Sequence, residues 1–272
     1  VSKMTRRLAE VLEEKVGRGD EALAALMAVA DQGDQPCREQ YVELGDRLGW
    51  KGIVATKLVE WYAEAPVGPD RHQALRGAFT RFVEVGREPD AAQVGQELIR
   101  TRGAEPSIAK HLEEIAVKLQ DLEALGASHD LLIQDLTGSS RAEEMVRQAE
   151  VLVSAGVDPQ EAIQHGEQAL SSVAPADVEV LLERLGRVAV APGHVIDLYE
   201  RQIVRCKAPS DRLAALARAA EVAADHDAGT RARGFFDLAL GAGVQEETLN
   251  AIEEVARSSD QRRGDSRLTA IL

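Results

Sequence analysis

The sequence predicts an all-α protein, an α-solenoid of about seven antiparallel helix pairs followed by one C-terminal helix. The first observation is the spacing of the prolines, because eight of nine fall on two regular series. These are Pro36, Pro69, Pro106, Pro175, Pro209 and Pro89, Pro159, Pro192, with gaps near 35 residues or twice that. Proline is tolerated in the first turn of a helix, so each of these prolines predicts a helix start. The second observation is the composition, which is not typical of strands. Aromatic residues make up 3% of the chain, and long β-branched runs are absent.

The first two helices follow from apolar periodicity. Leu8, Val11 and Leu12 recur on one helical face, and Gly17 ends that pattern. A second amphipathic helix begins at Asp20 and continues toward Gly33. Together they form the first predicted helix pair.

The remaining elements repeat this order of helix, short turn and helix. The predicted pairs are 35–48 with 50–64, 70–86 with 89–102, 106–119 with 121–136, 140–155 with 159–172, 176–189 with 192–206, and 209–225 with 229–241. A fifteenth helix is predicted over 245–258 without a partner. An amphipathic hairpin of this size cannot bury both of its apolar faces alone, so we expect the hairpins to stack.

The predicted solenoid covers residues 1–258, and residues 259–272 form a tail that is polar and then apolar. We expect this tail to be partly ordered or to begin a further repeat. Solenoids normally shield their end faces with polar capping repeats, and none is evident here. This favours a segment of a longer array, with a tail folded back as a partial cap as the alternative. Uncapped ends would also promote end-to-end self-association.

Small residues recur in the second helix of each pair, at the positions where helices approach closely. The best example is the frame of Ala162, Gly166 and Ala169. Its first position recurs at intervals of 32 to 38 residues: Ala22, Val54, Ala91, Ala124, Ala162, Val195, Ala232. First helices carry a large-x-x-Leu-Gly pattern, clearest at Tyr41, Leu44 and Gly45. These motifs resemble the tetratricopeptide repeat (TPR) or a related TPR-like helical hairpin.

The resemblance implies a right-handed superhelix whose concave face, lined mainly by first helices, holds a partner's extended peptide or helix. One branch of the family grips chaperone C-termini through a carboxylate clamp of asparagine and basic residues. This chain contains a single asparagine, Asn250, outside the best-matching repeats. The sequence therefore argues against a chaperone-tail adaptor.

The chain is acidic, with a formal net charge of −14 and a pI near 5.0. Such a chain repels nucleic-acid phosphates and anionic membrane surfaces, so neither is expected as a partner. Two explanations of the acidity stay open: solubility of a large helical surface, or an acidic groove for a basic protein or peptide. There is also no apolar run of 18 residues, so no membrane insertion is expected.

The two cysteines, Cys37 and Cys206, lie five repeat steps apart, too far for a disulfide. We expect free thiols and a cytoplasmic location, with a removed signal peptide as the alternative. Arginine outnumbers lysine 25 to 7, which suggests a bacterial genome rich in G and C.

No catalytic, cofactor-binding or metal-binding constellation is recognisable in the sequence. Cys-x-x-Cys and His-Glu-x-x-His motifs are absent. His111 with Glu114, and His194 with Asp197, share helix faces and are interpreted as surface ion pairs or partial caps. Neighbouring glutamates point about 100° apart on a helix and so do not form catalytic dyads. These pairs are Glu13-Glu14, Glu113-Glu114, Glu143-Glu144 and Glu253-Glu254.

Two further features are interpreted conservatively. An aromatic cluster comprises Trp50, Trp61, Tyr62, Phe79 and Phe82. It is interpreted as packing between adjacent hairpins, with a peptide-binding hot spot as the alternative. The tripeptide at 263–265, Arg-Gly-Asp, is interpreted as a chance match to an integrin-binding motif.

The leading hypothesis is therefore a non-enzymatic protein-interaction scaffold that binds a peptide or helix on an acidic concave face. The sequence does not select the residues that bind. Two alternatives are a regulatory or spacer module of a larger multidomain bacterial protein, and an all-helical enzyme.

Overall fold

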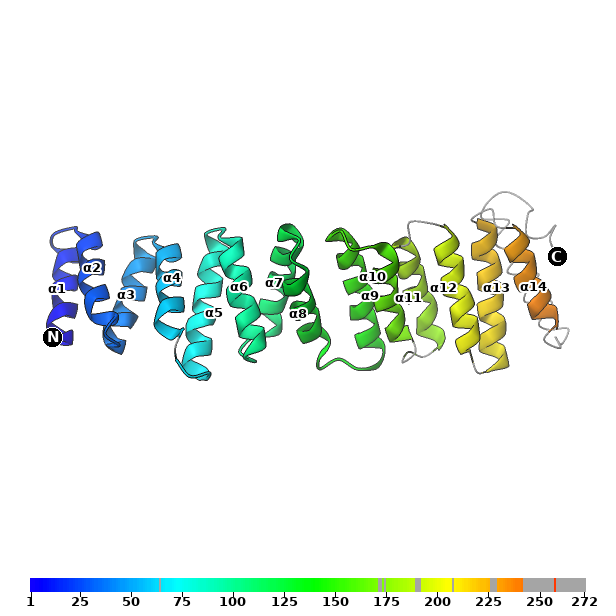
Figure 1. Cartoon of the computed structure of the whole chain (residues 1–272), viewed down its shortest axis with the longest axis horizontal. Helices are drawn as coiled ribbons and strands as arrows, with labels where there is room; N and C mark the ends of the chain where they lie inside the picture. The colour runs from blue at the N-terminus through cyan, green and yellow to red at the C-terminus, as the bar shows by residue number, and fades with distance from the viewer. Residues whose placement is uncertain are drawn as a thin grey trace. The chain divides into compact units, whose positions relative to one another are not determined.

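The structure, a computed structural model, describes residues 1–63, 65–170, 173, 175–188, 192–206, 208–225, 229–241 and 257. The elements assigned in these residues are fourteen α-helices, and no strand occurs among them (Figure 1). They are α1 (Ser2–Glu14), α2 (Gly19–Ala30), α3 (Gln35–Arg47), α4 (Lys51–Tyr62), α5 (Pro69–Glu84), α6 (Glu88–Arg100), α7 (Pro106–Leu119), α8 (Leu122–Ile133), α9 (Gly138–Ser154), α10 (Pro159–Leu170), α11 (Pro175–Val188), α12 (Pro192–Arg205), α13 (Pro209–Asp225) and α14 (Gly229–Gly241).

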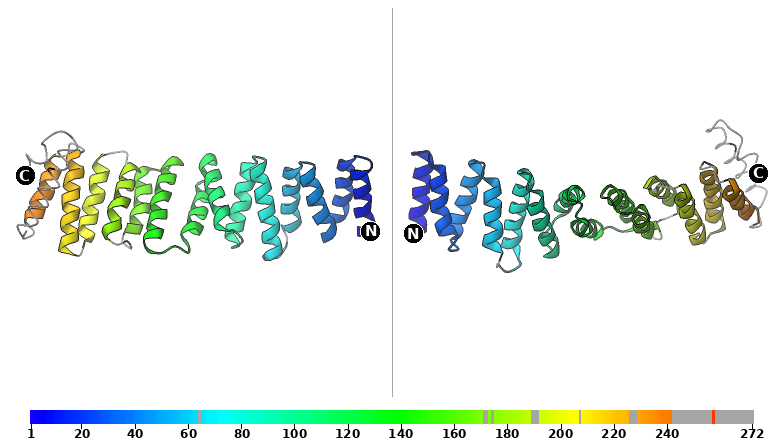
Figure 2. Two further views of the ribbon diagram at one scale, coloured as in Figure 1. Left: turned by 180° about the vertical axis from the view of Figure 1, so that it is seen from behind. Right: turned by 45° about the horizontal axis from the view of Figure 1, so that its top comes forward.

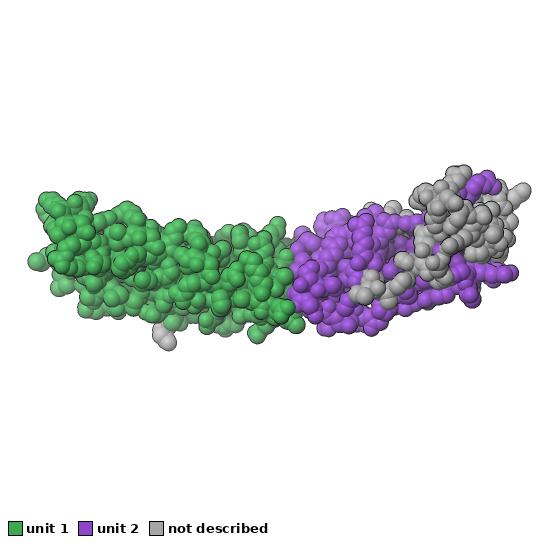
Figure 3. Space-filling view, turned by 90° about the horizontal axis from the view of Figure 1, so that it is seen from above, with its two compact units in different colours: residues 1–135 green, residues 136–272 purple. Residues whose placement is uncertain are grey.

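The helices fall into two compact units (Figure 3). Each unit is a stack of antiparallel hairpins. Unit 1 spans Val1–Asp135 and contains α1 to α8, and unit 2 spans Leu136–Leu272 and contains α9 to α14. Odd-numbered helices are called first helices below, and even-numbered helices second helices. Within a unit each second helix packs on its own first helix and on the first helix of the next hairpin. Figure 2 shows the same hairpins from two further directions.

This arrangement confirms the predicted all-α solenoid of helical hairpins. All eight prolines of the two series occupy the first or second residue of a helix. The described helices match the seven predicted pairs to within a few residues at each end. The fifteenth helix over 245–258 falls, apart from residue 257, outside the described residues, as does the tail at 259–272. One continuous right-handed superhelix over 1–258 stays a prediction, since each unit is described by itself.

Glycines end several helices because they adopt the left-handed conformation that closes a helix C-terminus. After α3, Gly49 has a φ of 79°, and the Trp50 N–H donates to the Gly45 carbonyl at 2.8 Å. After α5, Gly86 has a φ of 70°, and the Arg87 N–H donates to the Phe82 carbonyl at 2.9 Å. Both turns have the hydrogen bonding of a Schellman motif, which explains the short, tight hairpin connections.

Close approach between α3 and α4 depends on Gly45. A Cβ atom at this position would lie 2.3 Å from Cγ2 of Val54, a β-branched side chain with little rotamer freedom. Gly126 on α8 is the opposite case, because a Cβ atom there would meet nothing within 4 Å. A glycine at position 45, part of the large-x-x-Leu-Gly pattern of first helices, is therefore a packing requirement.

We expect Gly45→Ala and Gly126→Ala to change stability in opposite directions. Alanine has the better helix propensity, so Gly126→Ala should raise the free energy of unfolding by about 0.5–1 kcal/mol. Gly45→Ala should lower it by about 1–3 kcal/mol, because overpacking outweighs that gain. Urea denaturation followed by circular dichroism measures both. A stabilising Gly45→Ala change would show that the α3–α4 contact is not tight.

Ion pairs between successive first helices repeat at the period of the fold. In unit 1, Arg47 reaches Glu13 at 2.7 Å and Arg81 reaches Asp46 at 2.5 Å. The same register recurs in unit 2. Its pairs are Arg184 with Glu150 at 2.8 Å and Arg218 with Glu183 at 2.5 Å. Exposed ion pairs contribute little to stability. In these four pairs, however, the arginine side chain connects one hairpin to the next.

Candidate protein-binding groove

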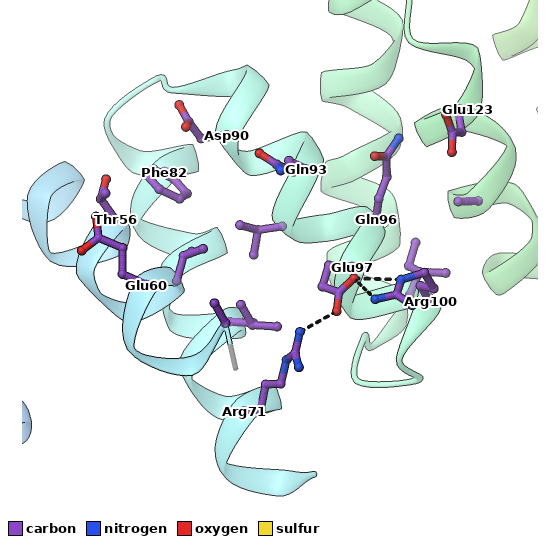
Figure 4. Close-up of a pocket in the computed structure, with 16 residues that line it drawn as sticks. Thr56, Glu60, Arg71, Phe82, Asp90, Gln93, Gln96, Glu97, Arg100 and Glu123 are labelled. Carbon is purple, nitrogen blue, oxygen red and sulfur yellow. Dashed lines mark hydrogen bonds and ion pairs between the residues drawn. The ribbon is translucent and has the colours of Figure 1, made fainter. Parts of the chain in front are cut away.

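One concave feature of unit 1 is a groove on the side of its second helices. It has a volume of about 660 Å³ and is bordered by α4, α6 and α8, with α5 beneath. Figure 4 shows Thr56 and Glu60 on one side, Gln93 on α6 between, and Glu123 on the other side. We call this feature the second-helix groove. Its lining residues are Thr56, Val59, Glu60, Ala63, Arg71, Leu75, Phe82, Asp90, Gln93, Val94, Gln96, Glu97, Ile99, Arg100, Glu123 and Ala127.

The floor of the second-helix groove is apolar. Leu75 and Phe82 of α5 are buried, and Val94 of α6 lies beside them. Val59 and Ile99 are half-buried and also line the groove. Burial of apolar surface is the main favourable term when a ligand enters such a groove.

The rim of the groove is charged and held in place by ion pairs. Glu97 accepts hydrogen bonds from Arg71 at 2.9 Å and from Arg100 at 2.5 Å, both drawn in Figure 4. Lys57 pairs with Glu60 at 2.7 Å, and this hydrogen bond raises the pKa of Lys57 above its usual range. These contacts orient the rim before any ligand arrives, which lowers the entropic cost of binding.

Arg87, in the turn before α6, links α4 to α6 near the groove. Its guanidinium donates to the Gly52 carbonyl at 3.3 Å and to Thr56 Oγ1 at 3.0 Å. It also pairs with Asp90 at 2.9 Å, and its Cζ lies 4.7 Å from the ring centre of Phe82. Contacts of this one side chain thus connect α4 to the start of α6.

Among the helices of unit 1, the excess of negative charge lies on the second helices. The first helices α1, α3, α5 and α7 carry ten acidic and ten basic residues. The second helices α2, α4, α6 and α8 carry eight acidic and three basic residues. The acidic residues are Asp20, Glu21, Glu60, Glu88, Asp90, Glu97, Glu123 and Asp130. The field on this side therefore favours a cationic ligand.

A second groove, of about 530 Å³, lies between the first helices α3 and α5. Eight of its twelve lining residues are polar or charged, and its two arginines are already engaged. Arg81 pairs with Asp46, and Arg38 lies 5.2 Å from the ring centre of Trp61. The predicted binding face on first helices thus corresponds to the smaller and more polar groove of unit 1.

The histidines are not arranged as the sequence suggested. His111 Nδ1 donates to the Ser107 carbonyl at 2.9 Å, and Gln160 Nε2 donates to His194 Nε2 at 3.1 Å. The buried pair is His129 on α8 with Glu113 on α7, whose Nε2 and Oε2 atoms are 3.0 Å apart. Sequence reasoning missed it because the partners are sixteen residues apart on different helices. Among the residues that the structure describes, no three metal-ligating side chains could hold a metal ion.

Most of the aromatic cluster packs within and between hairpins, as the favoured interpretation predicted. Phe79 and Phe82 are buried in α5. Trp61 meets the edge of Tyr41, with ring centres 5.3 Å apart, and its Nε1–H donates to Asp31 Oδ1 at 2.6 Å. Trp50 is exposed.

Both cysteines are free thiols, as predicted. Burial raises the pKa of Cys37 and also the pKa of Cys206. No helix in the described ranges is both long and apolar enough to cross a membrane. Asn250, His226, the Glu253-Glu254 pair and the Arg-Gly-Asp tripeptide at 263–265 lie outside the described residues.

Comparisons with known proteins give similarity at the level of repeat architecture. No protein-family model matches the sequence, and no characterised protein matches it by sequence. A tetratricopeptide repeat protein from Parabacteroides merdae ATCC 43184 is 12% identical, with a TM-score of 0.35 over 95% of this chain and 98% of that one. A circular tandem repeat protein is 15% identical, with a TM-score of 0.25 over 99% of this chain and 74% of that one. The repeat assignment rests on the chain's own hairpins, which resemble the tetratricopeptide repeat in helix order and repeat length.

Proposed function

We propose that the protein is a non-enzymatic scaffold that binds a peptide or helix of a partner protein in the second-helix groove of unit 1. The observation that carries this proposal is an apolar floor of Leu75, Phe82 and Val94 beneath a pre-oriented polar rim. Apolar grooves with a few fixed polar groups are typical of peptide and helix recognition. The smaller groove between α3 and α5 is the second candidate site.

The partner segment would combine apolar side chains with lysine or arginine. Apolar residues would fill the floor, and basic residues would face Glu60 and Glu123, which are exposed on opposite sides of the groove. Rim charges mainly set the association rate and the salt dependence, so they select among partners. The excess of acidic residues on the second helices favours the same class of ligand.

Selection of peptides from a random displayed library on the full chain tests this proposal. We expect enriched peptides to contain apolar residues flanked by lysine or arginine. Their affinity should fall about tenfold when monovalent salt rises from about 50 to 500 mM, because salt screens exposed charges.

A charge reversal then tests the position of the site. Glu60→Lys with Glu123→Lys should weaken binding about tenfold, at about 0.7 kcal/mol for each charge. Asp20→Lys with Asp130→Lys is the matched control, because both residues are exposed acids of second helices that do not line the groove. Equal losses for the two double variants would mean that only net charge matters. A library that yields no binder above background would contradict the proposed function.

A further inference from the structure

Charged side chains of opposite sign line the two ends of the second-helix groove. Asp90 is the third residue of α6 and Arg100 is its last, so about 15 Å separates them at a rise of about 1.5 Å per residue. Glu123 is the second residue of α8, and Arg71 is the third residue of α5, the antiparallel partner of α6. The two acids therefore lie toward one end of the groove and the two arginines toward the other, as Figure 4 shows.

The end that contains the two acids keeps a negative charge. Asp90 Oδ2 accepts a hydrogen bond from Arg87 Nε at 2.9 Å. The Glu123 carboxylate forms no ion pair with any residue that the structure describes, and Asp121, the N-cap of α8, adds a third carboxylate close to it. Three carboxylates and one guanidinium leave two negative charges in excess. We call Asp90 and Glu123 the acidic end of the groove.

At the opposite end, two arginines share one carboxylate. Glu97 accepts hydrogen bonds from Arg71 Nη2 at 2.9 Å and from Arg100 Nε at 2.8 Å. By contrast, Arg47 has Glu13 as a partner of its own. One positive charge is therefore in excess in the cluster of Arg71, Glu97 and Arg100, which we call the arginine end of the groove.

Glu60 does not cancel this excess, because it is itself paired with Lys57 at 2.7 Å. Arg71 is held by the protein, since its side chain is 16% exposed and its Nη1 donates to the Ala65 carbonyl at 2.8 Å. The arginine that a ligand can reach is therefore Arg100.

Arg100 keeps one edge of its guanidinium for a ligand. Its side chain is 72% exposed, and it donates to Glu97 through Nε and Nη2. A guanidinium carries five N–H donors on two edges, and each edge can bind a carboxylate through two parallel hydrogen bonds. The Nη1 group makes no hydrogen bond to any residue that the structure describes, so the edge with Nη1 can accept a second carboxylate.

We infer that the second-helix groove takes a partner segment with a fixed order of charges, a lysine or arginine at the acidic end and a carboxylate on the Nη1 edge of Arg100. This inference rests on the proposed function and adds to it the carboxylate and the charge order. In an extended segment, at about 3.3 Å per residue, the two charges are about four or five residues apart. In a helix they are about ten residues apart. Apolar residues between them would contact Val94 and the rest of the floor.

Two selections from one displayed library test the charge order, the first on the full chain and the second on Arg100→Glu. On the full chain we expect most enriched peptides to carry an acidic residue at one of these spacings from a lysine or arginine. On Arg100→Glu the acidic position should change to lysine or arginine, because the charge that it faces is reversed. Arg7→Glu is the matched control, since Arg7 is an exposed arginine of α1 that does not line the groove, and it should select the same acidic peptides as the unmodified chain.

A double-mutant cycle with one synthetic selected peptide measures the contact itself. Replacing the peptide's acidic residue by the corresponding amide should weaken binding to the full chain about fivefold. The same replacement should weaken binding to Arg100→Gln less than about twofold, because the partner charge is already absent. Each peptide is made with a free and with an amidated C-terminus, which distinguishes a side-chain carboxylate from that of the chain end.

Enriched peptides that bind in the groove without any carboxylate would overturn this inference and leave the proposed function standing. The same conclusion would follow if loss of the carboxylate weakened binding equally in the full chain and in Arg100→Gln. A library without binders would contradict the proposed function and this inference together.

Discussion

Replacing His129 by leucine is expected to lower the free energy of unfolding of unit 1 by about 3 kcal/mol. His129 is 4% exposed and its partner Glu113 is 7% exposed, so water reaches neither side chain freely. The Nε2–Oε2 distance of 3.0 Å allows a charge-assisted contact between α7 and α8. Leucine would remove that contact and leave the Glu113 carboxylate buried without it.

A double variant separates the cost of losing the His129–Glu113 contact from the cost of a changed shape. His129→Leu with Glu113→Leu should recover most of the lost stability, because apolar replacement of both partners of a buried pair is often neutral. His111→Leu on the exposed face of α7 should change the free energy of unfolding by less than about 0.5 kcal/mol. Chemical denaturation followed by circular dichroism measures all three. A His129→Leu effect below about 1 kcal/mol, or no recovery in the double variant, would contradict the assigned role of the pair.

Gln93→Trp is expected to weaken binding of a selected peptide about 100-fold, equivalent to about 2.7 kcal/mol. Gln93 lies on α6, lines the second-helix groove and is exposed, so an indole there would occupy the groove without disturbing the core. The physical cause is that the indole would prevent the ligand from contacting the apolar floor. Burial of one large side chain of the ligand there is worth about 1.5–3 kcal/mol.

Gln73→Trp is the matched control for this substitution. Gln73 is also an exposed glutamine on a helix, but it lines the groove between α3 and α5. Isothermal titration calorimetry should show binding within about twofold of the unmodified chain. The reverse pattern, a large loss for Gln73→Trp and none for Gln93→Trp, would assign binding to the first helices.

Local sequence signals predicted the helices well because each element carries its own start and stop. Pro69 and Pro106 begin helices, and Gly49 and Gly86 close them, as the physical preferences of these residues require. The large-x-x-Leu-Gly pattern singled out Gly45, and the structure adds that α4 approaches it closely. These features depend on neighbours within a few residues, which a single sequence displays directly.

Less of the candidate site could be predicted from the sequence, because a groove depends on packing between hairpins. The resemblance to the tetratricopeptide repeat favoured the first helices, whereas the larger groove of unit 1 lies beside second helices. The sequence did contain one signal for the side of the second helices. Once the helices are assigned, the excess of acidic residues on the second helices can be counted from the sequence. The apolar floor could not be predicted from the sequence. It combines Leu75 and Phe82 of α5 with Val94 of α6, and helix periodicity does not give the distance between residues on different helices.

Photo-crosslinking of a selected peptide to the full chain tests the central claim most directly. The peptide carries one benzophenone group, and the crosslinked residues are mapped by mass spectrometry after digestion. Binding in the second-helix groove predicts crosslinks within residues 56–63, 90–100 and 123–127. Crosslinks confined to residues 35–43 and 70–81 would place the ligand between α3 and α5 and would contradict the proposed site.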